Sequence, residues 1–78
     1  MHAEQLVRMV NDISEFFGPA SPEAEAAAEV AGHLKRQWDP RMRRQIVEIW
    51  QAGQGEFSPV GRAAVALLAH EAAAKAAG

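Results

Sequence analysis

The chain has 78 residues, of which 49% are hydrophobic, and its formal net charge is -2. These values predict one small soluble domain spanning residues 1–78, with a core that supplies no more than about 3–5 kcal/mol of net stability. The absence of cysteine excludes thiolate catalysis, iron–sulfur ligation and disulfides within this chain. The polar N-terminus lacks a long apolar run, which argues against a signal peptide or membrane span and favours a cytoplasmic location.

The first two predicted helices are separated by a glycine and two prolines. Large apolar side chains recur every three or four residues from Glu4 to Phe17, which predicts the first helix. Gly18-Pro19 is expected to end it, because glycine accepts a left-handed cap and proline cannot continue the hydrogen-bond ladder. Ser21 and Pro22 then predict an N-cap and a first helical position. The expected inward stripe of the second helix consists of Ala24, Ala27, Val30, Ala31, Leu34 and Trp38.

A third helix is predicted to begin at Asp39-Pro40. The residue before a proline is pushed out of the helical region, and Asp39 is a good N-cap with proline at the first position after it. The expected core stripe of this helix consists of Met42, Ile46 and Ile49. Gly53-Gln54-Gly55 is expected to end the helix.

Ser58-Pro59 repeats the cap signature and predicts a fourth helix, whose expected core residues are Val60, Ala64, Leu67 and Leu68. The alanine-rich tail from about residue 72 has nothing large to bury and is expected to fray. No alternating strand pattern occurs along the chain. The predicted fold class is therefore all-α, a small compact domain of three to four short helices in an antiparallel, bundle-like arrangement.

Charge is unevenly distributed along the chain. Residues 1–29 carry six acids against one base, whereas residues 35–44 carry five of the eight basic side chains. Arg41, Arg43 and Arg44 fall in the first turn of the third helix, where the helix dipole makes each cation cost about 0.3–1 kcal/mol. Stability of the fold alone is a weak reason for three arginines at this place. A partner that supplies carboxylates is the simplest explanation.

Aromatic side chains lie close to this basic segment. Tryptophan and arginine are enriched at binding hot spots, so Trp38 and Trp50 beside the arginines favour a protein-docking face. A solvated surface, with Arg44 paired to Glu48, and a nucleic-acid site are the alternatives. Trp38 also lies on the core stripe of the second helix, which leaves a structural role open. For Phe16-Phe17 we favour burial in the core over contact with a partner.

Nothing in the sequence has the pattern of a catalytic or metal site. The three histidines, at positions 2, 33 and 70, lack the four-residue spacing typical of helical metal ligands. Ser14, Ser21 and Ser58 are expected at surface or cap positions, without an acid–base pair beside them. We therefore expect no catalytic, cofactor-binding or metal-binding residue and no enzymatic activity of the chain alone.

Three stretches resemble the delta subunit of cytoplasmic NAD-dependent formate dehydrogenases. They are Leu6-Val7-Arg8-Met9 with Asn11, Ile13 and Phe16-Phe17; His33 with Trp38-Asp39-Pro40-Arg41-Met42-Arg43; and Gly53, Gly55, Phe57 and Pro59. The middle stretch is long and unusual enough to be specific, and the resemblance runs nearly end to end. The departures from the family pattern are at Val10, Asp12, Gln54 and Phe57.

The resemblance implies a non-catalytic accessory subunit of a molybdenum- or tungsten-containing complex, supporting its assembly, its stability or cofactor insertion. Its partners would be the larger subunits, with the catalytic alpha subunit as the first candidate. Those subunits would carry the molybdopterin, the iron–sulfur clusters, FMN and the NAD site, and this chain would bind none of them. Neither a membrane nor a nucleic acid is expected as a partner.

Combining the resemblance with the charge pattern gives a set of expected interface residues: Arg8, Asn11, Trp38, Arg41, Arg43, Arg44 and Trp50. Two alternative functions stay open at this point. One is a stand-alone helical adaptor or assembly chaperone for another oxidoreductase. The other is a small nucleic-acid-binding protein.

Overall fold

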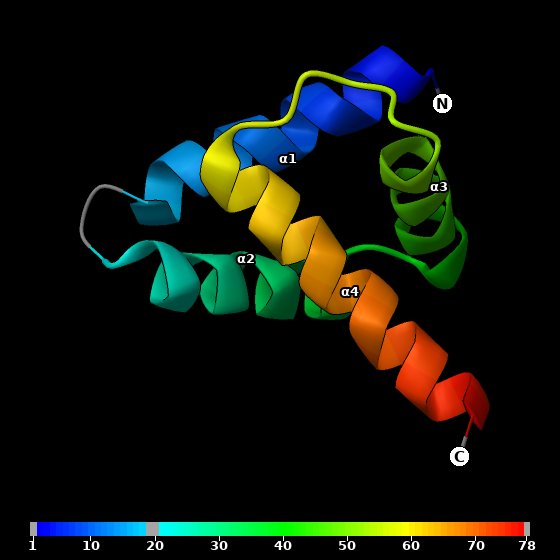
Figure 1. Cartoon of the computed structure of the whole chain (residues 1–78). Helices are drawn as coiled ribbons and strands as arrows, with labels where there is room; N and C mark the ends of the chain where they lie inside the picture. The colour runs from blue at the N-terminus through cyan, green and yellow to red at the C-terminus, as the bar shows by residue number, and fades with distance from the viewer. Residues whose placement is uncertain (1, 19–20, 78) are drawn as a thin grey trace.

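The computed structural model describes residues 2–18 and 21–77, and every regular element in these residues is a helix. The four helices are α1 (Ala3–Phe17), α2 (Glu23–Gln37), α3 (Pro40–Gln51) and α4 (Pro59–Ala77). Figure 1 shows α1 and α2 running in opposite directions, α3 standing where α1 begins and α2 ends, and α4 crossing over α2. The all-α fold class is therefore confirmed. The antiparallel arrangement describes α1 and α2, and the other two helices cross this pair.

One hydrophobic core takes side chains from all four helices. Its largest fully buried members are Leu6, Val10, Val30, Leu34, Ile46 and Val65. The most extensive helix contact is between α2 and α4, where small buried residues such as Ala27, Ala31 and Ala64 face the core. Ala24, expected in the core, is exposed, and Ala26 is buried in its place. The neighbouring helices cover the side of α2 on which Ala26 and Val30 lie one turn apart.

The buried face of α4 differs from the expected one. Gly61, Ala64, Val65 and Leu68 are buried, at the spacing of one continuous helical face. Leu67 retains 36% of its exposure, because it lies on the opposite side of the helix from Val65. The expectation is therefore confirmed for Ala64 and Leu68 and wrong for Leu67, whose place in the core is taken by Val65.

Helix α4 extends well beyond its last core residue. It continues to Ala77, and the fraying expected from about residue 72 stays a prediction. The side chains of residues 71–75 are all exposed, so this segment has no core contacts of its own. Alanine has the highest intrinsic helix propensity, and a helix satisfies its own backbone hydrogen bonds, which accounts for the continuation.

The C-terminal end of α1 and the start of α2 differ from the predicted caps. Gly18 has φ -61° and ψ -45°, a right-handed rather than left-handed conformation, and its N–H still bonds to the carbonyl oxygen of Ser14. The second half of the predicted stop signal, Pro19, lies outside the described residues. Pro22, not Ser21, occupies the N-cap of α2, without a side-chain cap bond. The N–H of Ser21 instead bonds to the carbonyl of Gly18, which sets the turn between the helices.

The caps of α3 and the start of α4 confirm the sequence prediction. Asp39 Oδ1 accepts a hydrogen bond of 2.9 Å from the N–H of Met42, and Pro40 is the first residue of α3. At the other end Gly53 adopts φ +72°, and the N–H groups of residues 53 and 54 bond back to the carbonyls of Trp50 and Ile49. This pair of bonds is the Schellman motif. Ser58 Oγ accepts a bond of 3.0 Å from the N–H of Gly61 and so caps α4.

The loop between α3 and α4 is fastened to α1 by Asn11. The side-chain amide of Asn11 donates to the carbonyl of Glu56 at 2.8 Å and accepts from the N–H of Ser58 at 2.9 Å. Gly55 has φ +85°, and a Cβ there would stand 2.8 Å from Cγ2 of Val7. The loop therefore lies directly against α1, and its path requires glycine at position 55.

A second close approach joins α1 to the first turn of α4. Ser14, expected at the surface, is buried, and its hydroxyl donates to the carbonyl of Val10 at 2.7 Å. A Cβ on Gly61 would stand 3.0 Å from Asn11 Oδ1 and 3.2 Å from Ser14 Oγ. The hydroxyl of Ser14 is small and internally satisfied, so α4 can pack against it without leaving an unpaired polar group.

The two adjacent phenylalanines have different environments. Phe17 is half-buried, packs against the core and has its ring centroid 6.1 Å from that of His33 on α2. Phe16 is 81% exposed and touches Phe17 edge to face. The preference for core burial was right for Phe17 and wrong for Phe16, because consecutive residues on a helix diverge by 100° and only one can follow the buried stripe.

Among the described helices none is long and apolar enough to cross a membrane.

Candidate partner-binding surfaces

The corner between α2 and α3 is built around Arg43. Its Nη1 donates hydrogen bonds to the carbonyl oxygen of Trp38 at 2.6 Å and to that of Lys35 at 3.0 Å. Both carbonyls belong to the C-terminal end of α2, where helical carbonyls lack partners of their own and carry partial negative charge. Arg43 therefore has a structural role that the sequence analysis missed. The charge that is unfavourable at the start of α3 is favourable at the end of α2.

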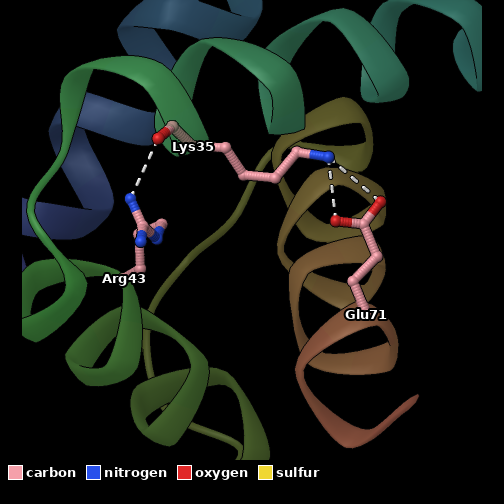
Figure 2. A network of polar contacts seen from close by, with 3 residues as sticks. All are labelled: Lys35, Arg43 and Glu71. Atoms are coloured by element: carbon pink, nitrogen blue, oxygen red, sulfur yellow. Dashed lines mark hydrogen bonds and ion pairs between the residues drawn. The ribbon is translucent and has the colours of Figure 1, made fainter. Parts of the chain in front are cut away.

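Lys35 extends this network to α4 (Figure 2). Its carbonyl accepts from Arg43, and its ammonium lies 2.9 Å and 3.2 Å from the two carboxylate oxygens of Glu71. The side chains of Lys35 and Glu71 are both about half exposed. Their ion pair contributes little to stability in water, and it links α4 to the end of α2.

Next to this network α3 and α4 enclose an open groove of about 770 Å³. Its apolar part includes Val47 and Leu68, and the exposed Ala72 continues it along α4. Basic side chains surround it: Lys35, Arg43, Arg44 and Lys75, with Glu71 as the single acid. We call this feature the basic groove. Its α3 wall carries two of the residues predicted to form an interface, Arg43 and Arg44.

Two of the predicted interface residues belong to helix α1 and lie outside the basic groove. Arg8 and Asn11 line a second groove of about 660 Å³, between α1 and the loop that follows α3. Arg8 is exposed there among Glu4, Asp12 and Glu56, whereas Asn11 is engaged with the loop backbone. Charges of both signs therefore share this second groove. The structure does not bring Arg8 together with the arginines at the start of α3.

The remaining arginines of the basic segment are exposed. Arg41 and Arg44 lie one turn apart at the start of α3, and both are exposed. In the part of the chain that the structure describes, neither forms an ion pair, so the pairing of Arg44 with Glu48 considered under the solvated-surface alternative is not seen. The first turn of α3 contains no acid either. The Asp39 carboxylate at the N-cap is the acid at this end of α3, and neither arginine forms an ion pair with it.

The two tryptophans have distinct positions. Trp38 is only 6% exposed and belongs to the core, so its structural role is confirmed and it offers almost no surface to a partner. Trp50 is half-buried, packs against the core and borders a shallow groove of about 380 Å³ with Phe57 and Arg62. This groove is separate from the basic groove, because the two have no lining residue in common.

Catalytic or metal chemistry finds no support in the arrangement of side chains. Across residues 2–18 and 21–77 no three histidine, aspartate or glutamate side chains come together as a potential metal site. Asn11 and Ser14 are engaged with backbone groups, and Ser58 caps a helix. The polar side chains of the described region thus either hold the fold or stand on its surface.

These features describe a small all-α protein with two charged grooves on its surface. The family model of the NADH-dependent formate dehydrogenase delta subunit FdsD matches residues 5–65. Because this match covers most of the chain, the chain belongs to the family of formate dehydrogenase delta subunits. Neither the curated proteins nor the solved structures gave a match.

The matched region contains α2, α3 and the loop fastened by Asn11. It ends inside α4, so the α4 wall of the basic groove, which includes Leu68, Ala72 and Lys75, lies beyond it. The α2–α3 corner thus lies inside the matched region, and the α4 wall of the basic groove lies outside it.

Proposed function

We propose that this chain is a non-catalytic accessory subunit of an NADH-dependent formate dehydrogenase, and that it supports assembly or stability of the complex through protein contacts. The observation that carries the proposal is the family match over residues 5–65. The roles of individual side chains support it as well. Asn11 and Arg43 serve the fold, whereas Arg41 and Arg44 are exposed without a structural partner among the described residues.

The partners in this proposal are the larger subunits of the complex, with the catalytic alpha subunit as the first candidate, in the cytoplasm. Those subunits carry the molybdopterin with molybdenum or tungsten, the iron–sulfur clusters, FMN and the NAD site. This chain binds none of these groups. Its lack of cysteine supports this division, because iron–sulfur clusters are held mainly by cysteine thiolates.

Removal of the chain tests the proposal. Cells that express the formate dehydrogenase with and without this chain are compared for formate-dependent reduction of NAD and for the amount of assembled complex on native gels. Without the chain both quantities should fall, and expression from a plasmid should restore both. Unchanged activity and unchanged complex in the deletion strain would contradict a role in assembly or stability.

The purified chain provides the second half of this experiment. It should not oxidise formate at any concentration. Turnover that rises in proportion to the concentration of pure chain, without contaminating subunits, would contradict a non-catalytic role.

A further inference from the structure

The basic groove has the form of a binding site for an extended or helical segment of another protein. It lies between the first turns of α3 and the last turns of α4, and its volume of about 770 Å³ is partly open to solvent. The apolar contacts available in it come from Val47 and Ala72, above the buried Leu68. Val47 is half-buried and Ala72 is exposed, so both keep surface that an aliphatic side chain can cover.

The basic side chains around the groove differ in whether they are already engaged within the fold. Arg43 is committed to the carbonyls of α2, and Lys35 is committed to Glu71. The side chains that remain are Arg44 on the α3 wall and Lys75 on the α4 wall, and both are exposed. No ion pair is formed by either of them with the residues that the structure describes. Two cations therefore flank an apolar strip from opposite sides, and their complement is a pair of carboxylates flanking an apolar side chain.

A nucleic acid is a poorer complement to this groove. Glu71 would lie beside its phosphates, and the apolar strip would meet a charged backbone. The chain also carries a net charge of -2, with its acids concentrated in the first 29 residues. Binding that relies on neutralising phosphates calls for a continuous basic surface, and the basic groove has only two uncommitted cations.

We propose that the basic groove receives an acidic segment of a larger formate dehydrogenase subunit, an inference that rests on the function proposed above. An aliphatic side chain of that segment packs on Val47 and Ala72, and carboxylates on either side of it pair with Arg44 and Lys75. Arg44, exposed near the start of α3, thereby acquires the negative partner that it lacks in the isolated chain.

The experiment uses the full-length chain, tagged and co-expressed with the larger subunits, and measures how much of those subunits it retains. The test variant is Arg44→Glu with Lys75→Glu. The matched control is Arg36→Glu with Arg62→Glu, which changes the net charge equally at exposed arginines that do not line the groove. Because like charges at an interface are strongly repulsive, the test variant should retain at least about tenfold less of the larger subunits, and the control should retain close to the wild-type amount.

A cross-linking measurement locates the contact independently of charge. Ala72 is replaced by a photoreactive benzoylphenylalanine, and exposed Ala28 on α2 receives the same group as a control. The groove position should cross-link to a segment of a larger subunit that is rich in aspartate or glutamate. Circular dichroism of each variant shows whether helicity is retained, and the cross-link remains informative if the charge variant is destabilised.

The outcomes separate the groove from the proposed function. Retention of the larger subunits by wild type, with equal retention by the charge reversal or no acidic cross-link from Ala72, would overturn the groove and leave the accessory role standing. Failure of the wild-type chain to retain any larger subunit would contradict both. A cross-link to a second copy of this chain, or co-purifying nucleic acid released by salt, would also overturn the proposal.

Discussion

The clearest test of the α2–α3 corner compares two arginines in the same helical turn. Arg43→Met keeps an apolar stem of similar length and removes the guanidinium that donates to the carbonyls of Trp38 and Lys35. Arg41→Met removes the same charge from an exposed side chain. In the described part of the chain, Arg41 forms no side-chain hydrogen bond and no ion pair. The two substitutions therefore change the net charge equally and differ in what they remove from the fold.

We expect Arg43→Met to lower the free energy of unfolding and Arg41→Met to leave it unchanged or raise it. Hydrogen bonds to a charged group contribute about 1.5–3 kcal/mol, and those of Arg43 share one half-buried nitrogen, so Arg43→Met should cost about 2 kcal/mol. In a domain of this size, that lowers the melting temperature by about 8–16 °C. Arg41→Met removes a cation from the positive end of α3 and should leave stability unchanged or raise it by about 0.3–1 kcal/mol.

Urea titration followed by circular dichroism at 222 nm measures both variants against the wild type at matched ionic strength. The slope of the unfolding free energy against urea should stay the same, since both variants expose similar surface on unfolding. Equal stabilities for the two variants would refute the reasoning. Arg43 would then be one more surface cation, and its bonds to α2 would contribute nothing.

Two further substitutions test the attachment of the loop to α1. Gly55→Ala should destabilise the fold by about 2 kcal/mol or more, because a left-handed alanine is strained and its Cβ would stand 2.8 Å from Val7 Cγ2. Gly53→Ala is the matched control: it has a similar positive φ but open space around the Cβ position, so urea titration should show a loss of only about 1–2 kcal/mol. Asn11→Ala should cost about 1–3 kcal/mol, because it removes two hydrogen bonds and leaves the N–H of Ser58 without its partner. Hydrogen exchange of the Ser58 amide should accelerate in Asn11→Ala, and an unchanged rate would contradict the attachment.

Local signals in the sequence were sufficient for much of the fold. Asp39-Pro40 and the Gly53 turn each act within five residues, and the structure forms the N-cap and the helix end that they predict. The spacing of the apolar residues was also sufficient to predict the buried stripe of α2 from Ala27 to Trp38. The sequence was not sufficient to predict which face of α4 is buried. The choice between Val65 and Leu67 depends on where α2 lies rather than on the hydrophobicity of either residue.

The candidate site was harder to predict for the same reason. The sequence placed Asn11 and Arg43 at an interface because polar side chains at specific positions suggest recognition. Asn11 binds a loop 45 residues away, and Arg43 binds the end of the preceding helix. Neither partner is visible as a sequence pattern, since backbone carbonyls are identical at every residue. An arginine three residues after Asp39-Pro40, close to the end of one helix, is the signal from which its capping role could have been predicted.

The unsupported end of α4 gives the molecule a gradient of local stability. Side chains up to Leu68 are held by the core, whereas residues 71–75 are attached to the rest of the fold through the half-exposed pair of Glu71 and Lys35. Amide protection should therefore decline along α4, with the last turns opening independently of global unfolding. We therefore expect the α3 wall of the basic groove to be the more rigid of the two and the α4 wall to be adjustable. A bound segment would meet one preorganised surface and one that can close against it, so part of the binding free energy would be used to order α4.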